Sequence, residues 1–411
     1  MNVLALVLAG GRVDELLCLT EMRPKSALPV FGTYRIIDFV LSNLMHAGIS
    51  NVGVLSQYRP YALVRHIGTG EHWDFVGRSR NIRMLPPYRG FKESDWYKGT
   101  ADAVYQNIAY IESFKPEHVL IASADHVYRM DYQPFIQYHV EMNADATVCF
   151  TKAEKRSSRF GYGLIDRKGK LADYQERPEI PPSDWVSMTL YLFKTEFVID
   201  VLRENAKEKS HEFGSDIITK LVSACRLFGY KFRGYWAYAR TVDSYYDTNM
   251  DMIKGKVALH SWQIRTNLTE RSAQADRLPA YVNGRVTDSV VSEGCIIEGS
   301  VVNSLLSPGV IVAPGAVVQD SIIFHDTVVS RDSKLTRVIC DKDTTIGAAC
   351  VIGGFGAETP SHEFKHLLHS GITLLGRNTT VPEKTEIGAN TTIYSTARIT
   401  QARIEPGSTL R

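Results

Sequence analysis

The fold of the C-terminal part is decided by residues 290–329, which read VVSEGCIIEGSVVNSLLSPGVIVAPGAVVQDSIIFHDTVV. Apolar pairs recur along this stretch every four to seven residues, and four glycines fall between them, at Gly294, Gly299, Gly309 and Gly315. A period near six is typical of a hexapeptide β-helix, whose coils bury their apolar side chains only by stacking on one another. A sandwich of short strands would instead space its turns at about 8–12 residues. The spacing therefore predicts a β-helix.

The same repeat continues on both sides of an interruption near the C-terminus. It begins after Pro279, runs over residues 340–354 and resumes over residues 387–393. The polar interruption carries His362, His366 and His369 at positions i, i+4 and i+7, which could in principle hold a metal ion. Because no carboxylate or thiol pattern lies beside them, we expect a solvated loop or a short helix there.

Before residue 251, short apolar runs alternate with helical patterns. The runs are Val3–Leu8 and residues 52–56, 118–122, 146–150 and 186–193, and they predict βαβ units around a mostly parallel sheet. Residues 100–113 have apolar side chains at helical spacing, and we expect Thr100 to cap this helix, whose positive N-terminus would face an anion. The predicted domains are residues 1–251, a connector over 252–278 and the β-helix over 279–411.

Composition excludes several classes of protein. The 411 residues are 44% hydrophobic, which is enough for real cores, so a disordered or fibrous chain is excluded. A formal charge of +2 supplies no broad cationic field, so we expect no binding to nucleic acid or to a membrane surface. No stretch reaches the 18 or so apolar residues of a membrane helix. The six cysteines form no CxxC pair and follow no secretory leader, which favours reduced thiols and the cytoplasm.

Two features near the N-terminus suggest phosphate binding. Gly10 and Gly11 follow the first predicted strand, and a glycine pair there lets backbone N–H groups approach phosphate oxygens. Lys25 lies between Pro24 and Pro29, which would stiffen a loop that carries its ammonium group back towards the glycines. Each feature alone is weak, because an isolated lysine is usually a surface residue.

Later segments give these features a context. In order and spacing the chain resembles bacterial glucose-1-phosphate adenylyltransferase (ADP-glucose pyrophosphorylase) at YRIIDF (34–39), LSN (41–43), QY (57–58), WYKGTADA (96–103), ADHVY (124–128), FG (160–161), ERP (176–178) and SM (187–188). The similarity runs over essentially the whole chain. It implies an α/β fold, in which a Rossmann-like nucleotide-diphospho-sugar transferase domain is followed by a left-handed parallel β-helix of hexapeptide repeats.

The resemblance also implies a reaction. ATP and glucose 1-phosphate would give ADP-glucose and pyrophosphate, the first committed step of glycogen synthesis. One anionic phosphate must attack another, so catalysis is mainly alignment and charge neutralisation, and positive groups and metal are expected. The family is tetrameric and allosteric, which implies a homotetramer or a hetero-oligomer with a paralogous subunit.

By resemblance, residues of the N-terminal domain take named roles. Asp125 would hold Mg²⁺, and its place just beyond an apolar strand fits the ligand edge of a doubly wound sheet, although a lone Asp after a strand is more often a turn residue. Gly10 and Gly11 would contact the nucleotide phosphates, Gln57 the adenine edge and Lys25 the pyrophosphate part. The sugar-phosphate positions would be Tyr97, Gly161, Glu176 and Ser187, with Arg177 on the phosphate of glucose 1-phosphate.

Several positions depart from the family pattern. The glycine loop usually reads GGxGTRL, but Val13 stands here for a glycine, and as a β-branched residue it should not adopt a positive φ. Glu15 replaces an arginine that neutralises the triphosphate. At an effective dielectric near 20, two unit charges about 4 Å apart interact by roughly 4 kcal/mol, so this exchange could cost several decades of rate.

Three further departures lie in later segments. Where the family has DVGT, whose aspartate is the other magnesium ligand, this chain has Tyr238-Ala239-Arg240-Thr241. A neutral tyrosine is a poor substitute for a hard anionic ligand. Arg177 replaces a lysine, which keeps the charge but changes a point contact into a planar fork. Thr189 replaces a glycine after Ser187-Met188.

The departures leave three hypotheses open. In the first, the enzyme is active with a rearranged site, in which Asp14 or Glu15 supplies the lost carboxylate and Arg240 or Arg12 the lost positive charge. In the second, the chain is a regulatory or catalytically weak subunit beside a catalytic paralogue. In the third, it is a sugar-phosphate or nucleotide sensor. An enzyme making GDP-mannose or UDP-glucose is disfavoured because YRIIDF and GTADA resemble the ADP-glucose branch.

Effector contacts are harder to assign. Arg35 and Arg59 are our candidates for anion contacts, because forked guanidinium groups suit phosphate. Solvated or fold-stabilising roles fit each of these arginines about equally well.

Overall fold

The computed structural model describes residues 2–11, 13–88, 96–153, 156–257, 264–267 and 278–411. By their contacts the residues divide into two compact units. Unit 1 comprises Met1–Gly11, Ile37–Pro60 and Ile67–Trp236, and unit 2 comprises Arg12–Ile36, Tyr61–His66 and Ala237–Arg411.

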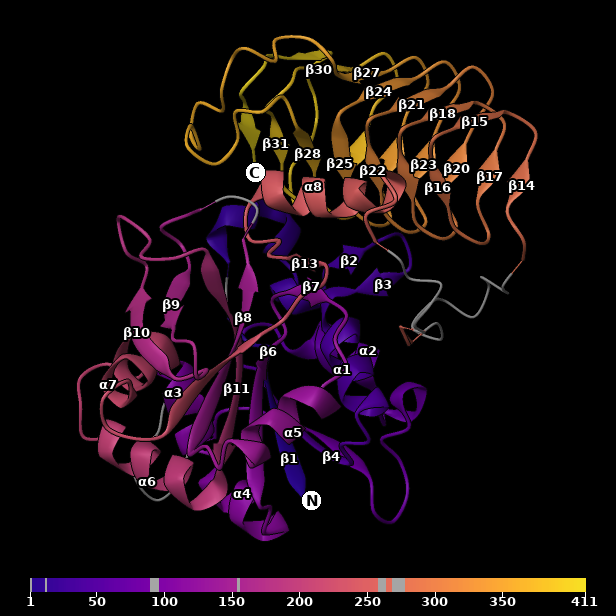
Figure 1. The fold of residues 1–411 in the computed structure, drawn as a ribbon. Helices are drawn as coiled ribbons and strands as arrows, with labels where there is room; N and C mark the ends of the chain where they lie inside the picture. Colours follow the sequence, from indigo (N-terminus) through magenta and orange to yellow (C-terminus); the bar gives the residue numbers. More distant parts are fainter. Residues whose placement is uncertain (1, 12, 89–95, 154–155, 258–263, 268–277) are drawn as a thin grey trace. The chain divides into compact units, whose positions relative to one another are not determined.

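Unit 1 is built on a nine-stranded mixed sheet (Figure 1). Its strands lie in the order β10-β9-β11-β6-β1-β4-β5, and β8 pairs with both β11 and β12. Their bounds are β1 Val3–Leu8, β4 Asn51–Leu55, β5 Asn81–Leu85, β6 His118–Ser123, β8 Ala146–Lys152, β9 Gly161–Ile165, β10 Leu171–Glu176, β11 Trp185–Lys194 and β12 Leu227–Lys231. Strands β6, β1, β4 and β5 are parallel, as predicted, whereas β11 runs antiparallel to β6, β8 and β9.

Strands β1, β4 and β6 are largely apolar because they are buried on both faces of the sheet. In β1 the four residues from Leu4 to Val7 have no exposed surface. Helix α6 packs against β6 and β11, and α5 packs against β8 and β12. The helices of this part of the chain are α1 Ile36–His46, α3 Thr100–Tyr105, α4 Ile108–Phe114, α5 Gln133–Glu141, α6 Thr195–Asn205 and α7 Thr219–Leu221, with a 3₁₀ helix at Glu71–Trp73 and a π-helix at Phe213–Ile218.

The helix predicted over 100–113 is two helices, α3 and α4. Asn107 lies between them with φ −107° and ψ 18°. Its side-chain nitrogen donates to the Ala103 carbonyl at 2.8 Å, the acceptor that a continuous helix would offer to the Asn107 backbone N–H. The side chain therefore competes with the helical hydrogen bond and ends α3.

Unit 2 contains the predicted β-helix. Its strands form three parallel sheets, because each strand pairs with the strand three positions later in the main run (Figure 1). The first sheet is β14 Tyr281–Val282, β17 Ile296–Ile297, β20 Ile311–Val312, β23 Val328–Val329, β26 Thr345–Ile346 and β29 Thr380–Val381. The second is β15 Arg285–Thr287, β18 Ser300–Val302, β21 Val317–Gln319, β24 Lys334–Thr336, β27 Val351–Gly353, β30 Glu386–Ile387 and β32 Arg403–Ile404. The third is β16 Val290–Val291, β19 Leu305–Leu306, β22 Ile322–Ile323, β25 Val338–Cys340, β28 Thr373–Leu375, β31 Thr392–Ile393 and β33 Thr409–Leu410.

The coils turn at residues that tolerate a left-handed backbone. Asp320, Asp326 and Asp332 have φ between 49° and 61°, and Gly309 and Gly315 have φ of 77° and 74°. Asp and Gly adopt this conformation more readily than other residues do, which explains their recurrence between the apolar pairs. Inside the coils most pairs bury at least one member, for example Val312, Val318 and Val329.

Unit 2 also contains a segment from near the N-terminus. This segment holds 3₁₀ helices at Asp14–Thr20 and Lys25–Ala27 and the short pair β2 Pro29–Val30 and β3 Tyr34–Arg35. The neighbouring α2 spans Tyr61–Ile67, and α8 spans Val242–Ile253. Thr241 caps α8 by accepting from the Ser244 amide at 3.2 Å, while the Ser244 hydroxyl accepts from the Thr241 amide at 2.9 Å. Most of the predicted connector beyond α8 lies outside the described residues.

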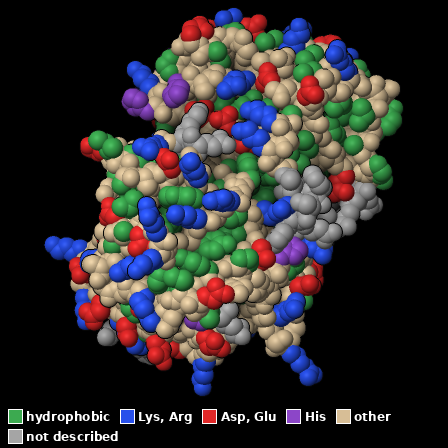
Figure 2. All heavy atoms as spheres, viewed as in Figure 1, with side chains coloured by type: hydrophobic (Ala, Val, Ile, Leu, Met, Phe, Trp, Pro, Cys, Tyr) green, Lys and Arg blue, Asp and Glu red, His purple; other side chains and the backbone are tan. Residues whose placement is uncertain are grey.

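The described part of the chain has a surface of mixed charge and free cysteines. Figure 2 shows basic and acidic side chains interspersed over the face in view. Within the described ranges we find no helix with the length and apolarity needed to cross a membrane. All six cysteines are free thiols. His362, His366 and His369 lie in a stretch of bends and turns, as expected of a loop.

Candidate active site

The loop after β1 requires a glycine at position 10. A Cβ on Gly10 would lie 2.8 Å from both the Gln57 backbone nitrogen and the Ser56 Cα. Only a residue without a Cβ lets the ends of β1 and β4 come this close. Gly11 is exposed, with open space where its Cβ would be. The glycine pair therefore leaves backbone N–H groups at the carboxyl end of β1, where they can donate to a phosphate.

Asp125 lies at the same edge of the sheet. Strand β6 runs beside β1 with Ser123 opposite Leu8, and the Ala124 amide donates to the Leu8 carbonyl at 2.9 Å. Asp125 follows in the turn and is half-buried. The carboxyl edge of a doubly wound sheet is where such folds bind ligands. Unit 1 thus brings Asp125 and the glycine pair to one edge, as two adjacent parallel strands dictate.

Gln57 and Tyr97 are joined through the Tyr97 backbone. The Gln57 carboxamide oxygen accepts from the Tyr97 amide at 2.8 Å, and its nitrogen lies 3.4 Å from the Tyr97 carbonyl oxygen. The Tyr97 hydroxyl donates to the Leu85 carbonyl at 2.9 Å, and burial raises the pKa of this hydroxyl. Gln57 therefore fixes the segment that carries Tyr97 in this structure.

Glu176 ends β10, and its carboxylate packs closely against two glycines. Its Oε2 accepts from the Tyr174 hydroxyl at 2.7 Å. A Cβ on Gly161 would lie 2.6 Å from that Oε2, and a Cβ on Gly214 would lie 2.2 Å from it. Burial raises the pKa of the Glu176 carboxyl, although Tyr174 and Arg177 work in the opposite direction. Both glycines therefore leave room for a carboxylate that can accept hydrogen bonds from hydroxyl groups.

Arg177 directly follows β10, and Ser187 lies on β11. Arg177 has φ 51°, its amide donates to the Phe160 carbonyl at 3.0 Å, and its Nε lies 3.8 Å from Glu176 Oε1. Its side chain is 64% exposed, so the guanidinium can reach an anion in solvent. Ser187 is buried, and its Oγ accepts from the Thr189 amide at 3.3 Å. Unit 1 therefore gathers Gly161, Glu176, Arg177 and Ser187 around β9, β10 and β11.

The N-terminus of α3 is arranged differently from our expectation. Gly99, not Thr100, is the N-cap residue, and Thr100 begins the helix. The Thr100 amide and hydroxyl both lie near Glu212 Oε2, at 3.2 and 2.6 Å. A carboxylate of the chain itself therefore takes the place that we expected an anionic ligand to fill. This contact could not be predicted from local sequence patterns, because Glu212 is 112 residues away.

In unit 2, Lys25 is almost fully buried and lies over an aromatic ring. Its side chain is 1% exposed, and its Nζ is 4.1 Å from the centre of the Tyr238 ring. A buried ammonium over a phenol face is a favourable cation–π contact. Tyr238 stands where the resemblance places a carboxylate, so Lys25 contacts an aromatic ring at this position.

Glu15 and Arg240 form an ion pair beside that ring. Arg240 Nε donates to Glu15 Oε1 at 3.0 Å, and its Nη1 donates to the Tyr238 hydroxyl at 3.0 Å. Burial alone would lower the pKa of Arg240, but Tyr238 and Glu15 outweigh it and raise that pKa further above its usual range. The exchanged charges of the sequence thus compensate each other directly within unit 2.

These contacts decide whether unit 2 fits a divalent cation. Tyr238 offers no carboxylate, Lys25 and Arg240 place positive charge beside it, and Glu15 is engaged with Arg240. Asp14 is exposed, and Arg12 lies outside the described residues. Among the described residues, no three His, Cys, Asp or Glu side chains gather as metal ligands would. Asp125 suits Mg²⁺ chemically, whereas the unit 2 residues do not.

The two effector candidates differ in their surroundings. Arg35 is buried in unit 2, where Nη1 donates to the Ala27 carbonyl at 3.1 Å and Nε lies 3.4 Å from His66 Nδ1. These contacts support the loop that follows Lys25. Arg59, in unit 1, is exposed and has φ 39°.

Some residues of the site were not predicted. Tyr174 and Gly214 shape the surroundings of Glu176, but neither stands in a motif that pointed to it. The pairing of Glu15 with Arg240 joins residues 225 apart in sequence. The sequence signal for this pair was that Glu15 replaces a family arginine while Arg240 adds a positive charge.

The chain matches two known protein families. Residues 4–255 match the family described as nucleotidyl transferase, and residues 277–375 match the family described as GlmU-like, C-terminal hexapeptide. The fold and the candidate site thus define a nucleotidyltransferase with a hexapeptide β-helix.

Curated relatives narrow this class. The glucose-1-phosphate adenylyltransferase of Fervidobacterium nodosum is 40% identical over 401 residues, covering 95% of each chain. Those of Thermosipho africanus and Acetivibrio thermocellus are 39% and 38% identical, over 95% and 96% of this chain and 95% and 94% of theirs. The chain belongs to the glucose-1-phosphate adenylyltransferase family.

Proposed function

We propose that this protein forms ADP-glucose and pyrophosphate from ATP and glucose 1-phosphate, a step that supplies glycogen synthesis. Family membership over nearly the full chain supports the reaction class. The observation that carries the substrate assignment is Glu176, a carboxylate held in a glycine-lined place between Gly161 and Gly214 with Arg177 beside it. A hydroxyl-accepting carboxylate next to an exposed guanidinium suits a sugar phosphate.

Charge neutralisation and alignment would supply most of the catalysis. In the proposed complex, Glu176 accepts hydrogen bonds from glucose hydroxyls and Arg177 holds the phosphate of glucose 1-phosphate. Tyr97, Gly161 and Ser187 complete the sugar-phosphate contacts. Gly10 and Gly11 donate backbone N–H groups to the nucleotide phosphates, Gln57 contacts the adenine, and Lys25 neutralises the pyrophosphate part.

Mg²⁺ enters the proposal only at Asp125. A hard divalent cation bound there would neutralise phosphate charge when present. The residues of unit 2 do not provide the second carboxylate of the family pattern.

A steady-state assay in both reaction directions tests the proposal. The expected result is ADP-glucose formation from ATP and glucose 1-phosphate, with pyrophosphate-dependent ATP formation in reverse. Glu176→Gln should raise the KM for glucose 1-phosphate by about ten- to hundredfold, because a hydrogen bond to a charged acceptor is lost. Folded protein with no turnover above background for any nucleoside triphosphate and sugar phosphate would contradict the proposal.

A second candidate function is a regulatory or catalytically weak subunit that acts beside a catalytic paralogue. The contacts among Glu15, Arg240, Tyr238 and Lys25 favour it, because they replace a metal-binding carboxylate and a triphosphate-binding arginine by an internally neutralised cluster. Mixing the chain with the paralogue from the same genome should then change the activity or the effector response of that paralogue. If neither changes, this candidate fails.

Both candidate functions imply an oligomeric enzyme that is regulated by effectors. We propose a homotetramer, or a hetero-oligomer with the paralogue, acting in the cytoplasm, with Arg59 as the effector contact that remains exposed. Light scattering of the chain alone and mixed with the paralogue distinguishes the two assemblies.

A sensor without transferase activity would bind ATP and glucose 1-phosphate yet show no isotope exchange between pyrophosphate and ATP.

A further inference from the structure

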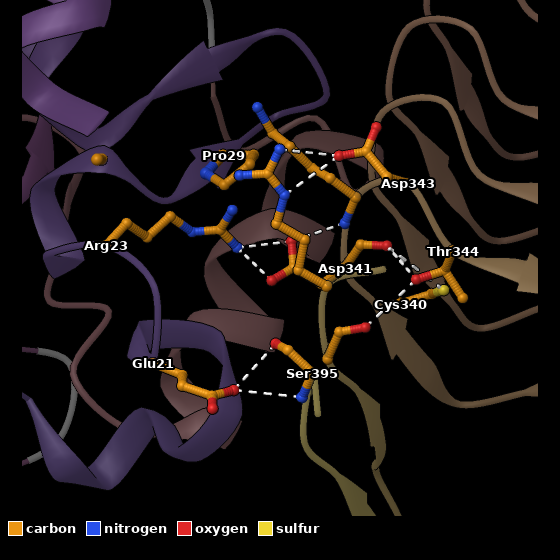
Figure 3. Close-up of polar contacts among 12 residues, drawn as sticks. Glu21, Arg23, Pro29, Cys340, Asp341, Asp343, Thr344 and Ser395 are labelled. Carbon is orange, nitrogen blue, oxygen red and sulfur yellow. Dashed lines mark hydrogen bonds and ion pairs between the residues drawn. The ribbon is translucent and has the colours of Figure 1, made fainter. Parts of the chain in front are cut away.

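A buried ion pair holds the chain two residues before Lys25. Arg23 Nη2 lies 2.6 Å from both carboxylate oxygens of Asp341, and the two side chains are 5% and 3% exposed (Figure 3). Asp341 directly follows strand β25 of the β-helix. The pair therefore joins the Lys25 segment to a coil of the β-helix, and both partners belong to unit 2.

The acceptor side of this pair is fixed. The Lys342 amide donates to Asp341 Oδ1 at 2.7 Å, and the Asp341 carbonyl accepts from the Thr344 hydroxyl at 2.8 Å. On the donor side, the guanidinium of Arg23 lies 5.8 Å from the centre of the Phe324 ring. Because both groups are buried, removing one partner leaves an uncompensated charge, which favours keeping the pair together.

Further contacts hold the segment on both sides of Lys25. Before it, Glu21 Oε2 accepts from the Ser395 amide at 3.2 Å and from its hydroxyl at 2.9 Å (Figure 3). After it, the Tyr245 hydroxyl donates to the Pro29 carbonyl, and the Phe31 amide donates to Asn249 Oδ1 at 2.9 Å. The acceptors and donors from outside the segment lie on α8 and on the β-helix. The segment is thus bound at several points to the C-terminal half of the chain.

The link from Arg23 to Lys25 is stiff. Pro24 lies between them with φ −69° and ψ 158°, and its ring fixes φ. Lys25 then begins a 3₁₀ turn, in which its carbonyl accepts from the Leu28 amide at 2.9 Å. A displacement of Arg23 should therefore displace the backbone of Lys25 as well.

We propose that Asp341, acting through Arg23, is a positioning residue for Lys25, so that the β-helix fixes the position of a buried lysine of the nucleotidyltransferase. The value of this for catalysis rests on the function proposed above for Lys25. The placement itself does not, and it can be measured without substrates.

The test is the rate at which Lys25 is acetylated in the full-length protein, followed by peptide mass spectrometry. In the wild type, Lys25 is buried and should react slowly. Asp341→Asn should raise the rate at Lys25 by at least about tenfold, because the loss of a buried ionic partner favours opening of the segment. Arg23→Lys, which keeps one charged contact, should stay within about threefold of the wild type.

Asp343→Asn is the matched control. Asp343 lies on the same turn, but its partner is the exposed Arg377, at 2.9 Å, and not the Lys25 segment. It should leave the Lys25 rate unchanged. Exposed lysines such as Lys207 serve as internal standards within each sample.

The double variant Arg23→Met with Asp341→Leu separates positioning from general stability. Removing both charges together avoids a buried unpaired ion, so the melting temperature should stay near that of the wild type. Under our proposal Lys25 still reacts at least about tenfold faster, because the directional contact is gone. If Lys25 is as protected in the double variant or in folded Asp341→Asn as in the wild type, the proposal is wrong. If Lys25 reacts faster in these variants while adenylyl transfer stays at the wild-type rate, only the function proposed for Lys25 is contradicted.

Discussion

Thr189 has a left-handed backbone conformation although its side chain is β-branched. It has φ 49° and lies where β11 shifts register between Ser187 and Tyr191. A β-branched residue in the left-handed region carries strain of about 1–3 kcal/mol. The glycine that the family resemblance places here would adopt this φ without strain.

Thr189→Gly should therefore stabilise the protein by about 1 kcal/mol, since the relieved strain outweighs the greater freedom of glycine in the unfolded chain. Urea unfolding measures the change. Thr151→Gly is the control, because Thr151 lies in the regular strand β8 and its replacement should destabilise. A destabilised Thr189→Gly variant would show that the threonine side chain outweighs the strain.

Glu176 makes stability depend on pH. Burial raises its folded-state pKa, so the folded protein binds a proton that the unfolded chain releases between the ordinary carboxyl pKa and the raised one. Stability from this group is full below the ordinary pKa and is lost as pH rises through the raised pKa. Glu176→Gln removes this loss, so the variant should gain stability relative to the wild type as pH rises through that window.

Urea midpoints across the acid to neutral range measure this difference. Glu179→Gln, at an exposed position nearby, should follow the wild type at every pH. A Glu176→Gln curve parallel to that of the wild type would argue that the carboxyl is not destabilised by its burial.

The cluster around Tyr238 gives a prediction about rate. Glu15→Arg with Tyr238→Asp alone would place two arginines side by side, because Arg240 now pairs with Glu15 at 3.0 Å. Adding Arg240→Gly restores the family pattern at all three positions. If the cluster limits turnover, this triple variant should raise kcat by about a hundredfold to a thousandfold, the equivalent of roughly 4 kcal/mol at an effective dielectric near 20.

The steady-state rate of ADP-glucose formation tests this at saturating substrates. The double variant is the informative comparison, since it should gain less than the triple variant. Equal rates for wild type and triple variant would mean that the cluster does not limit catalysis.

At the scale of elements, sequence periodicity predicts what depends on local burial. The run Val3–Leu8 forms β1 with the predicted bounds, and the apolar pairs of residues 290–329 fall in the coils, because both patterns reflect side chains that must be buried nearby. The break at Asn107 was missed because it depends on one side chain taking a helical acceptor. The antiparallel course of β11 depends on pairing, which periodicity does not encode.

The cap of α8 is an element whose contribution can be measured. Thr241→Ala removes the acceptor for the Ser244 amide and should lower the stability of unit 2 by about 1 kcal/mol. Thr241→Ser keeps the hydroxyl and should stay within a few tenths of a kcal/mol of the wild type. Hydrogen exchange of peptides from α8 reports the difference, and equal exchange in the two variants would mean that the cap does not stabilise the helix.

At the scale of the molecule, the division into units could not be predicted from sequence. The domains predicted from the change of texture are continuous stretches, whereas unit 2 includes residues 12–36 and 61–66 with the β-helix. Contacts such as Arg23 with Asp341 join residues 318 apart, and neither composition nor periodicity points to them. The candidate site residues of unit 1 were easier to foresee, since their motifs follow consecutive strands.

This division predicts which segments lose stability together. Ile323 is fully buried in the β-helix, and Ile323→Ala should cost about 2–5 kcal/mol through lost burial and a cavity. Because coils of a β-helix stabilise one another by stacking, hydrogen exchange should accelerate along the β-helix. Residues 13–32 should accelerate with it, since their anchors lie there, whereas β1 and β6 should keep their protection. Val148→Ala in the unit 1 core should instead accelerate exchange in β1 and β6 and leave the β-helix and residues 13–32 protected. If residues 13–32 exchange at the same rate as β1 in both variants, the segment is bound mainly to unit 1.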